Sequence, residues 1–115
     1  MKQLAKLPYQ IRDEDLDGLP GGDFVIAGLK ELREGTPREF GLLVLIASAR
    51  LNALGLDVPR RYDIVRPVEH QLYGLLELTH ANGAYSYYNS LLRTLASFLH
   101  ALENRVSAKA SEPEA

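Results

Sequence analysis

The sequence has no cysteine, which excludes disulfides, thiol nucleophiles and cysteine-based zinc or iron–sulfur sites. It also lacks a long apolar run. The longest uncharged one, residues 40–49, has ten residues, whereas a membrane-spanning helix needs about twenty. The first residues include no apolar stretch of the kind that a signal peptide carries. We therefore expect a soluble, cytoplasmic protein that does not bind membranes.

A large excess of charge of either sign is absent as well. The 115 residues include 13 Lys and Arg and 15 Asp and Glu, for a formal net charge of −2. Nucleic-acid-binding domains usually carry a clear basic excess, so this balance argues against DNA or RNA as a partner. The length suits one domain, which can bury about two-thirds of its unfolded surface.

The composition predicts an all-α fold. Leu occurs 21 times but Val and Ile together only ten, and Leu favours helices whereas β-branched residues favour strands. Apolar periodicity predicts four helices, at residues 23–34, 37–54, 67–81 and 84–106. We expect a mostly antiparallel, bundle-like domain (21–106) between an irregular arm (1–20) and a flexible tail (107–115).

Glycine and proline mark the boundary between the first two helices. Gly35 is expected to end the first helix in the left-handed conformation. Thr36 can then act as an N-cap, Pro37 suits the first helical position, and Glu39 can complete a capping box. The sequence therefore predicts a short turn that leads directly into the second helix.

The second predicted helix is apolar around its whole circumference, with Phe40 and Leu43 among its side chains. A helix on the surface of a globular protein normally has a polar side. This helix should therefore be the most buried element, or it should face a partner.

Tyrosines cluster at the start of the last predicted helix. Helical periodicity places Tyr85 and Tyr88 on its inward stripe and Tyr87 elsewhere. Tyrosine is common in protein interfaces, because it combines apolar area with a hydrogen-bonding tip. The cluster either covers one end of the bundle or forms an interaction surface together with Phe40 and Leu43.

Glu77 and His80 have the three-residue spacing that metal-binding helical bundles use. A reversed pair, His100 and Glu103, lies on the last helix. However, Glu77 and His80 share a helix face with Glu69 and Tyr73, opposite the Leu stripe. We therefore favour a solvated face and expect no metal and no cofactor. No nucleophile-elbow motif for hydrolase chemistry is present.

Four arginines offer a further alternative. Arg60, Arg61 and Arg66 lie in the connection before the third helix, and Arg50 lies shortly before it. Arginine is suited to phosphate contacts, but Asp57 and Asp63 interrupt this group. Local ion pairs are the simpler interpretation.

The functional prediction is a non-enzymatic interaction, accessory or regulatory module that binds a protein partner or associates with itself. The two alternatives are a metal-binding helical protein that uses Glu77 and His80, and a weak nucleic-acid binder that uses the four arginines.

Overall fold

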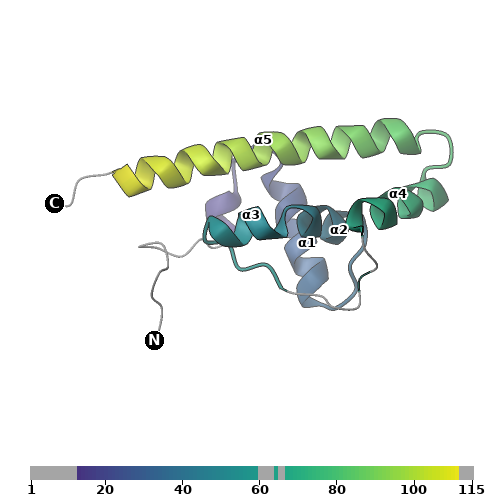
Figure 1. Cartoon of the computed structure of the whole chain (residues 1–115), viewed down its shortest axis with the longest axis horizontal. Helices are drawn as coiled ribbons and strands as arrows, with labels where there is room; N and C mark the ends of the chain where they lie inside the picture. The colour runs from purple at the N-terminus through teal and green to yellow at the C-terminus, as the bar shows by residue number, and fades with distance from the viewer. Residues whose placement is uncertain (1–12, 60–63, 65–66, 112–115) are drawn as a thin grey trace.

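Helices form the regular structure of the residues that the computed structural model describes, 13–59, 64 and 67–111 (Figure 1). In chain order they are the 3₁₀ helix η1 (Asp13–Leu16), α1 (Gly22–Arg33), α2 (Glu39–Ile46), α3 (Ser48–Ala53), α4 (Val68–Thr79) and α5 (Ala84–Ser111). The prediction of an all-α fold is confirmed. The antiparallel arrangement is seen for α4 and α5, which lie side by side and are joined by a short turn (Figure 1); a regular four-helix bundle stays a prediction.

The end of α1 is fixed by Gly35, as the sequence predicted. Gly35 has a φ of +80°. Its N–H donates to the Leu32 carbonyl at 3.2 Å, and the Thr36 N–H donates to the Glu31 carbonyl at 3.1 Å. This pair of bonds is a Schellman motif, which satisfies carbonyls that the helix end leaves open.

The start of α2 differs from the prediction, because the capping box does not form. The N-cap residue is Arg38, and its side chain makes no capping hydrogen bond. Glu31 of α1 takes that role: its Oε1 accepts from the N–H groups of Arg38 and Gly41, both at 2.7 Å. A carboxylate there also interacts favourably with the helix dipole. Glu31 thus joins the end of one helix to the start of the next.

Close packing of α1 against α2 depends on Gly28. A Cβ at this position would overlap the carbonyl oxygen of Phe40, so a larger residue would push the two helices apart. Next to this contact the Phe24 and Phe40 rings stack, with centroids 4.9 Å apart. Because Gly28 has no side chain, the two helices can approach closely enough for their neighbouring side chains to pack together.

The predicted second helix is divided in two at Ala47, which has a φ of −103° and a ψ of 16°. Residues 41–45 of α2 are all buried, which confirms the expectation of a central, buried helix. In α3, by contrast, only Leu51 is fully buried, while Arg50 and Asn52 are exposed. The change of direction lets the chain leave the core where its polar residues begin.

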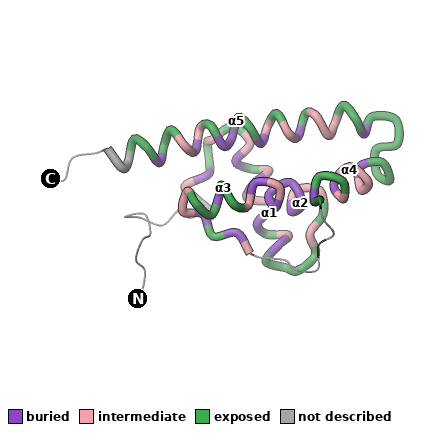
Figure 2. The backbone as a smooth tube through the Cα atoms, viewed as in Figure 1, coloured by how far each residue is buried: buried purple, intermediate pink, exposed green. Residues whose placement is uncertain are grey.

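Helix α5 extends along the other elements for about 42 Å, at 1.5 Å per residue over its 28 residues. Phe98 on α5 and Leu16 on η1 have no exposed surface and belong to the same core. Buried residues concentrate around α1 and α2, whereas the turn between α4 and α5 is exposed (Figure 2). Neither α5 nor another helix of the described residues has both the length and the apolarity to span a bilayer.

The ends of the helical region lie outside the predicted bounds. Leu16, in the predicted arm, is buried, and the Asp15 carbonyl accepts a hydrogen bond from Arg105 at 2.7 Å. At the other end α5 continues to Ser111, five residues past Val106. The division into arm, domain and tail stays a prediction, but η1 packs with the domain.

Replacing Glu31 with Ala should lower the free energy of unfolding by about 1–2 kcal/mol, because two N–H groups at the start of α2 lose their acceptor. Urea denaturation measures this loss. Glu34→Ala is the matched control, since Glu34 is exposed near the end of the same helix. Equal stability of both variants would contradict the capping role of Glu31.

Replacing Gly28 with Ala should destabilise the fold by about 1–3 kcal/mol, because the new methyl group overlaps the Phe40 carbonyl. Gly74→Ala is the matched control in α4, where nothing lies within 4 Å of an added Cβ. That variant should gain about 0.5–1 kcal/mol from better helix propensity. Thermal unfolding would refute the close-packing role if both variants shifted the melting temperature in the same direction.

Candidate functional site

The α4–α5 hairpin carries the candidate site. The last residue of the turn, Gly83, donates its N–H to the His80 carbonyl at 3.0 Å, and its own carbonyl accepts from Tyr87 N–H at 2.9 Å. The break that the sequence predicts between the helices at 67–81 and 84–106 is thus confirmed, and the turn sets the two helices in opposite directions (Figure 1). Side chains from both helices consequently meet along one side of the hairpin.

They form a hollow of about 420 Å³, here called the tyrosine groove. Its lining residues are Glu69, His70, Tyr73, Gly74, Glu77, Tyr85 and Tyr88. The α4 members recur every three or four residues, which places them on one helix face. The sequence grouped Glu69, Tyr73 and Glu77 correctly, whereas His80 does not line the groove.

Tyr88 is the half-buried tyrosine that α5 contributes to the groove. Its ring meets the Tyr73 ring edge-on, with centroids 5.3 Å apart and planes at 83°. Burial raises the pKa of the Tyr88 phenol above the usual 10.0, and the nearby charge of Glu69 raises this pKa further. The negative charge of Glu69 therefore acts on the aromatic wall of the groove.

Tyr87 joins α5 to α2. Its hydroxyl donates to Oε2 of Glu39 at 3.2 Å, and its ring lies against His80 at a centroid distance of 4.6 Å. Burial is the main cause that raises the pKa of Tyr87, followed by the charge of Glu39 and by this hydrogen bond. Glu39 thus accepts a hydrogen bond from Tyr87 instead of completing the predicted capping box.

Tyr85 is 69% exposed, so the prediction that it faces inward was wrong. The buried stripe of α5 begins at Ala84 and continues through Leu91 and Leu95, which leaves Tyr85 one residue out of phase. Leu78, near the end of α4, is 85% exposed. Leu78, residues 80–83 and Tyr85 are together called the hairpin tip.

The α2 members of the predicted interaction set lie elsewhere. Leu43 has no exposed surface, and Phe40 is half-buried and stacked on Phe24. Leu43 is thus a core residue in this conformation, although the sequence offered it as a contact residue. The apolar circumference of α2 is covered by the chain's own helices.

The metal-site candidates are not brought together. His80 has its Nδ1 2.8 Å from the Thr79 hydroxyl, and its ring packs on Tyr87. Glu103 forms an ion pair with Arg50, and His100 lies about 24 Å along α5 from Ala84, at 1.5 Å per residue over 16 residues. Within residues 13–59, 64 and 67–111, no three His, Asp or Glu side chains are placed to hold one ion.

The arginines divide into two groups. The Nε of Arg50 donates to Oε2 of Glu103 at 3.0 Å, which connects α3 to α5. Arg50 therefore forms an ion pair, but its partner is distant in the sequence; the local ion pairs of the other arginines stay a prediction. Both side chains are substantially exposed, so the pair contributes at most about 1 kcal/mol. Arg60, Arg61 and Arg66 lie outside the described residues.

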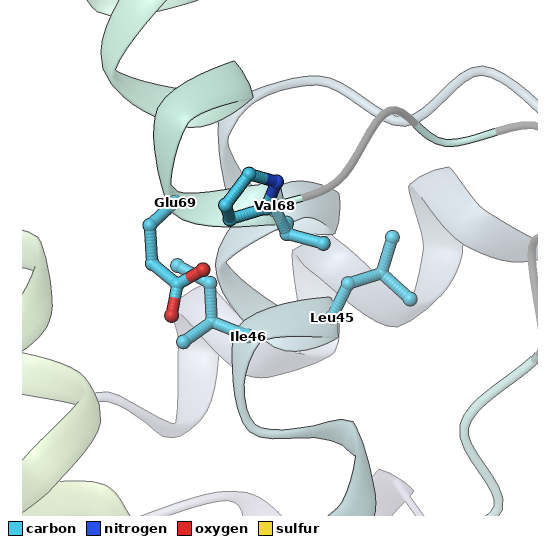
Figure 3. A pocket seen from close by; sticks show the side chains of 5 residues that line it. Leu45, Ile46, Val68 and Glu69 are labelled. Carbon is cyan, nitrogen blue, oxygen red and sulfur yellow. The ribbon is translucent and has the colours of Figure 1, made fainter.

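A second hollow, of about 470 Å³, lies between the end of α2 and the start of α4. Leu45 and Ile46 line it from α2, and Pro67, Val68 and Glu69 line it from the start of α4 (Figure 3). Four of its five lining residues are apolar, and the fifth is Glu69. We assign it no role. Glu69 belongs to both hollows.

No protein-family model matches the chain, and it shows no significant similarity to a curated protein or to a solved structure. The chemistry of its own residues is therefore the basis for assigning a function.

One signal for this site could have been read from the sequence. Residues 67–92 contain four of the six tyrosines and two glutamates, but no Lys or Arg. The stretch thus has 26 residues without Lys or Arg in a chain that contains 13 of them. The pairing of the two helices was needed to show that these tyrosines and glutamates form one surface.

Replacing Glu39 with Gln should lower the pKa of Tyr87, because the neutral amide no longer repels the phenolate. Glu69→Gln is the reciprocal control, which should lower the pKa of Tyr88 and leave that of Tyr87 in place. A titration followed by ¹³C NMR of labelled tyrosine resolves both groups. Equal shifts of both tyrosines in each variant would contradict these pairings.

The stability of the wild-type protein should also depend on alkaline pH. A phenol with a raised pKa in the folded state contributes stability that is complete below 10.0, the usual value, and is lost as the pH rises through the folded-state pKa. This loss should be smaller in Glu39→Gln.

Proposed function

We propose that this chain is a non-enzymatic protein-interaction module that contacts a partner protein with the outer surface of the α4–α5 hairpin. The exposure of Leu78 and Tyr85 at the hairpin tip is the observation that carries the proposal. Leu78 and Tyr85 are the large hydrophobic side chains that the described part of the chain leaves exposed, and both lie at the same end. Tyrosine is one of the residue types that contribute most binding energy in interfaces, and Leu78 adds apolar area beside it.

The surroundings of the hairpin tip support the same interpretation. The tyrosine groove beside it offers half-buried aromatic rings that a partner side chain can cover. Tyr87 and its bond to Glu39 hold the first turns of α5 against α2, so the surface is preformed. A rigid surface loses less entropy on binding than a mobile one.

Self-association through the same hairpin tip is the second candidate. Two copies related by a twofold axis would bury Leu78 and Tyr85 against each other, as in a closed, isologous dimer. The same exposed residues favour this candidate. Its distinguishing feature is a mass that rises with protein concentration.

Replacing both Leu78 and Tyr85 with Ser should weaken association at least about tenfold without unfolding the chain, because both side chains are largely solvated in the folded protein. Co-purification with the tagged chain from its native cells measures partner binding. Size-exclusion chromatography with light scattering measures self-association of the purified chain.

The double variant Ala49→Ser with Ala96→Ser, at exposed positions of α3 and α5, is the matched control and should associate as the wild type does. Circular dichroism verifies the fold of each variant. A strictly monomeric chain without a stoichiometric partner would refute the proposal, as would association that the hairpin-tip variant leaves intact.

A further inference from the structure

The part of the hairpin nearest its turn, residues 67–92, carries negative charge from its glutamates, Glu69 and Glu77, and no charge from Lys or Arg. Both glutamates are exposed at the tyrosine groove, and neither forms an ion pair within the described part of the chain. Of the side chains that line the groove, only His70 can become positively charged. An anionic ligand would therefore meet repulsion there.

The aromatic lining favours the opposite charge. Tyr73, Tyr85 and Tyr88 come from both helices, and the Tyr73 and Tyr88 rings meet edge-on. The face of a tyrosine ring carries negative electrostatic potential, which attracts ammonium and guanidinium groups. The charge of Glu69 reaches the same wall, as its effect on the pKa of Tyr88 indicates.

The dimensions and chemistry of the groove fit a long cationic side chain. An uncharged apolar anchor would form no ion pair with Glu69 or Glu77. A Lys or Arg side chain can lay its methylene stem on the tyrosines and bring its charged end to a carboxylate. The volume of about 420 Å³ accommodates such a side chain with space to spare.

We infer that the tyrosine groove receives a Lys or Arg side chain from a basic segment of a partner protein, held between the tyrosine rings and the carboxylates of Glu69 and Glu77. This inference rests on the proposed function, because it names the chemistry of the partner at the same hairpin surface. A second copy of this chain is a poorer occupant, since an isologous contact would place the two acidic grooves against each other.

The test uses the full chain and two synthetic peptides. One is an acetylated nonapeptide with the repeat Ala-Ala-Arg, and the other carries citrulline, an uncharged analogue of similar shape, at each Arg position. Two-dimensional ¹H–¹⁵N NMR at low salt should show saturable shifts for the Arg peptide over residues 69–77 and 85–88. The citrulline peptide should bind at least about tenfold more weakly, because it lacks the charge that both the rings and the carboxylates attract.

The variant Glu69→Gln with Glu77→Gln should weaken binding of the Arg peptide about tenfold and make it less sensitive to salt. Glu34→Gln with Asp57→Asn is the matched control: it removes two exposed acidic charges elsewhere and should bind as the wild type does. Tyr85→Ala should also weaken binding, which a purely long-range charge effect would not produce.

Equal binding of both peptides would overturn the inference, and so would equal losses in the two charge variants or shifts outside the hairpin. Concentration-dependent shifts of these residues without peptide would place a second copy in the groove and would also overturn it. Suppose that neither peptide binds the chain but that replacing Leu78 and Tyr85 with Ser still abolishes association with the partner. That result would overturn this inference and leave the proposed function intact.

Discussion

The contact between α1 and α2 is the constraint on which the other elements depend. Gly28 lets the two backbones approach closely, and Glu31 satisfies the N–H groups that the start of α2 would otherwise leave open. A helix that is apolar on every side needs cover in every direction. Helix α1 packs against one side of α2, and α4 and α5 pack against its other sides. The outward faces of α4 and α5 therefore form part of the surface of the molecule.

Local sequence signals accounted for most of the helices. Leu-rich periodicity and the left-handed Gly35 were sufficient to predict α1, α4 and most of α5. The cap of α2 could not be predicted, because its acceptor comes from Glu31 on the preceding helix and competes with the local capping box. The break at Ala47 could not be predicted either. The segment is apolar on every side, so its sequence has no helical periodicity whose interruption would indicate a break.

The candidate site could be predicted only in part. Tyrosines at the start of the last helix marked the end of the molecule where the tyrosine groove and the hairpin tip lie. Their individual orientations depend on the helix phase, and a shift of one residue changes which of them are buried. Ala84 starts the buried stripe, so Tyr85 faces solvent and Tyr87 lies beside Glu39. Leu43, which the sequence offers as a contact residue, is fully buried. Its burial depends on tertiary packing, which cannot be predicted from helical periodicity alone.

The position of α5 in the chain has a consequence for biosynthesis. This helix follows all the other described helices, yet its Phe98 shares a core with Leu16, more than 80 residues earlier. Translation proceeds at about 5–20 residues per second, so the earlier helices leave the ribosome seconds before α5, which packs on them, has been synthesised. The nascent chain therefore passes through an interval in which apolar surface of η1 and α1 is open to chaperones or to neighbouring chains.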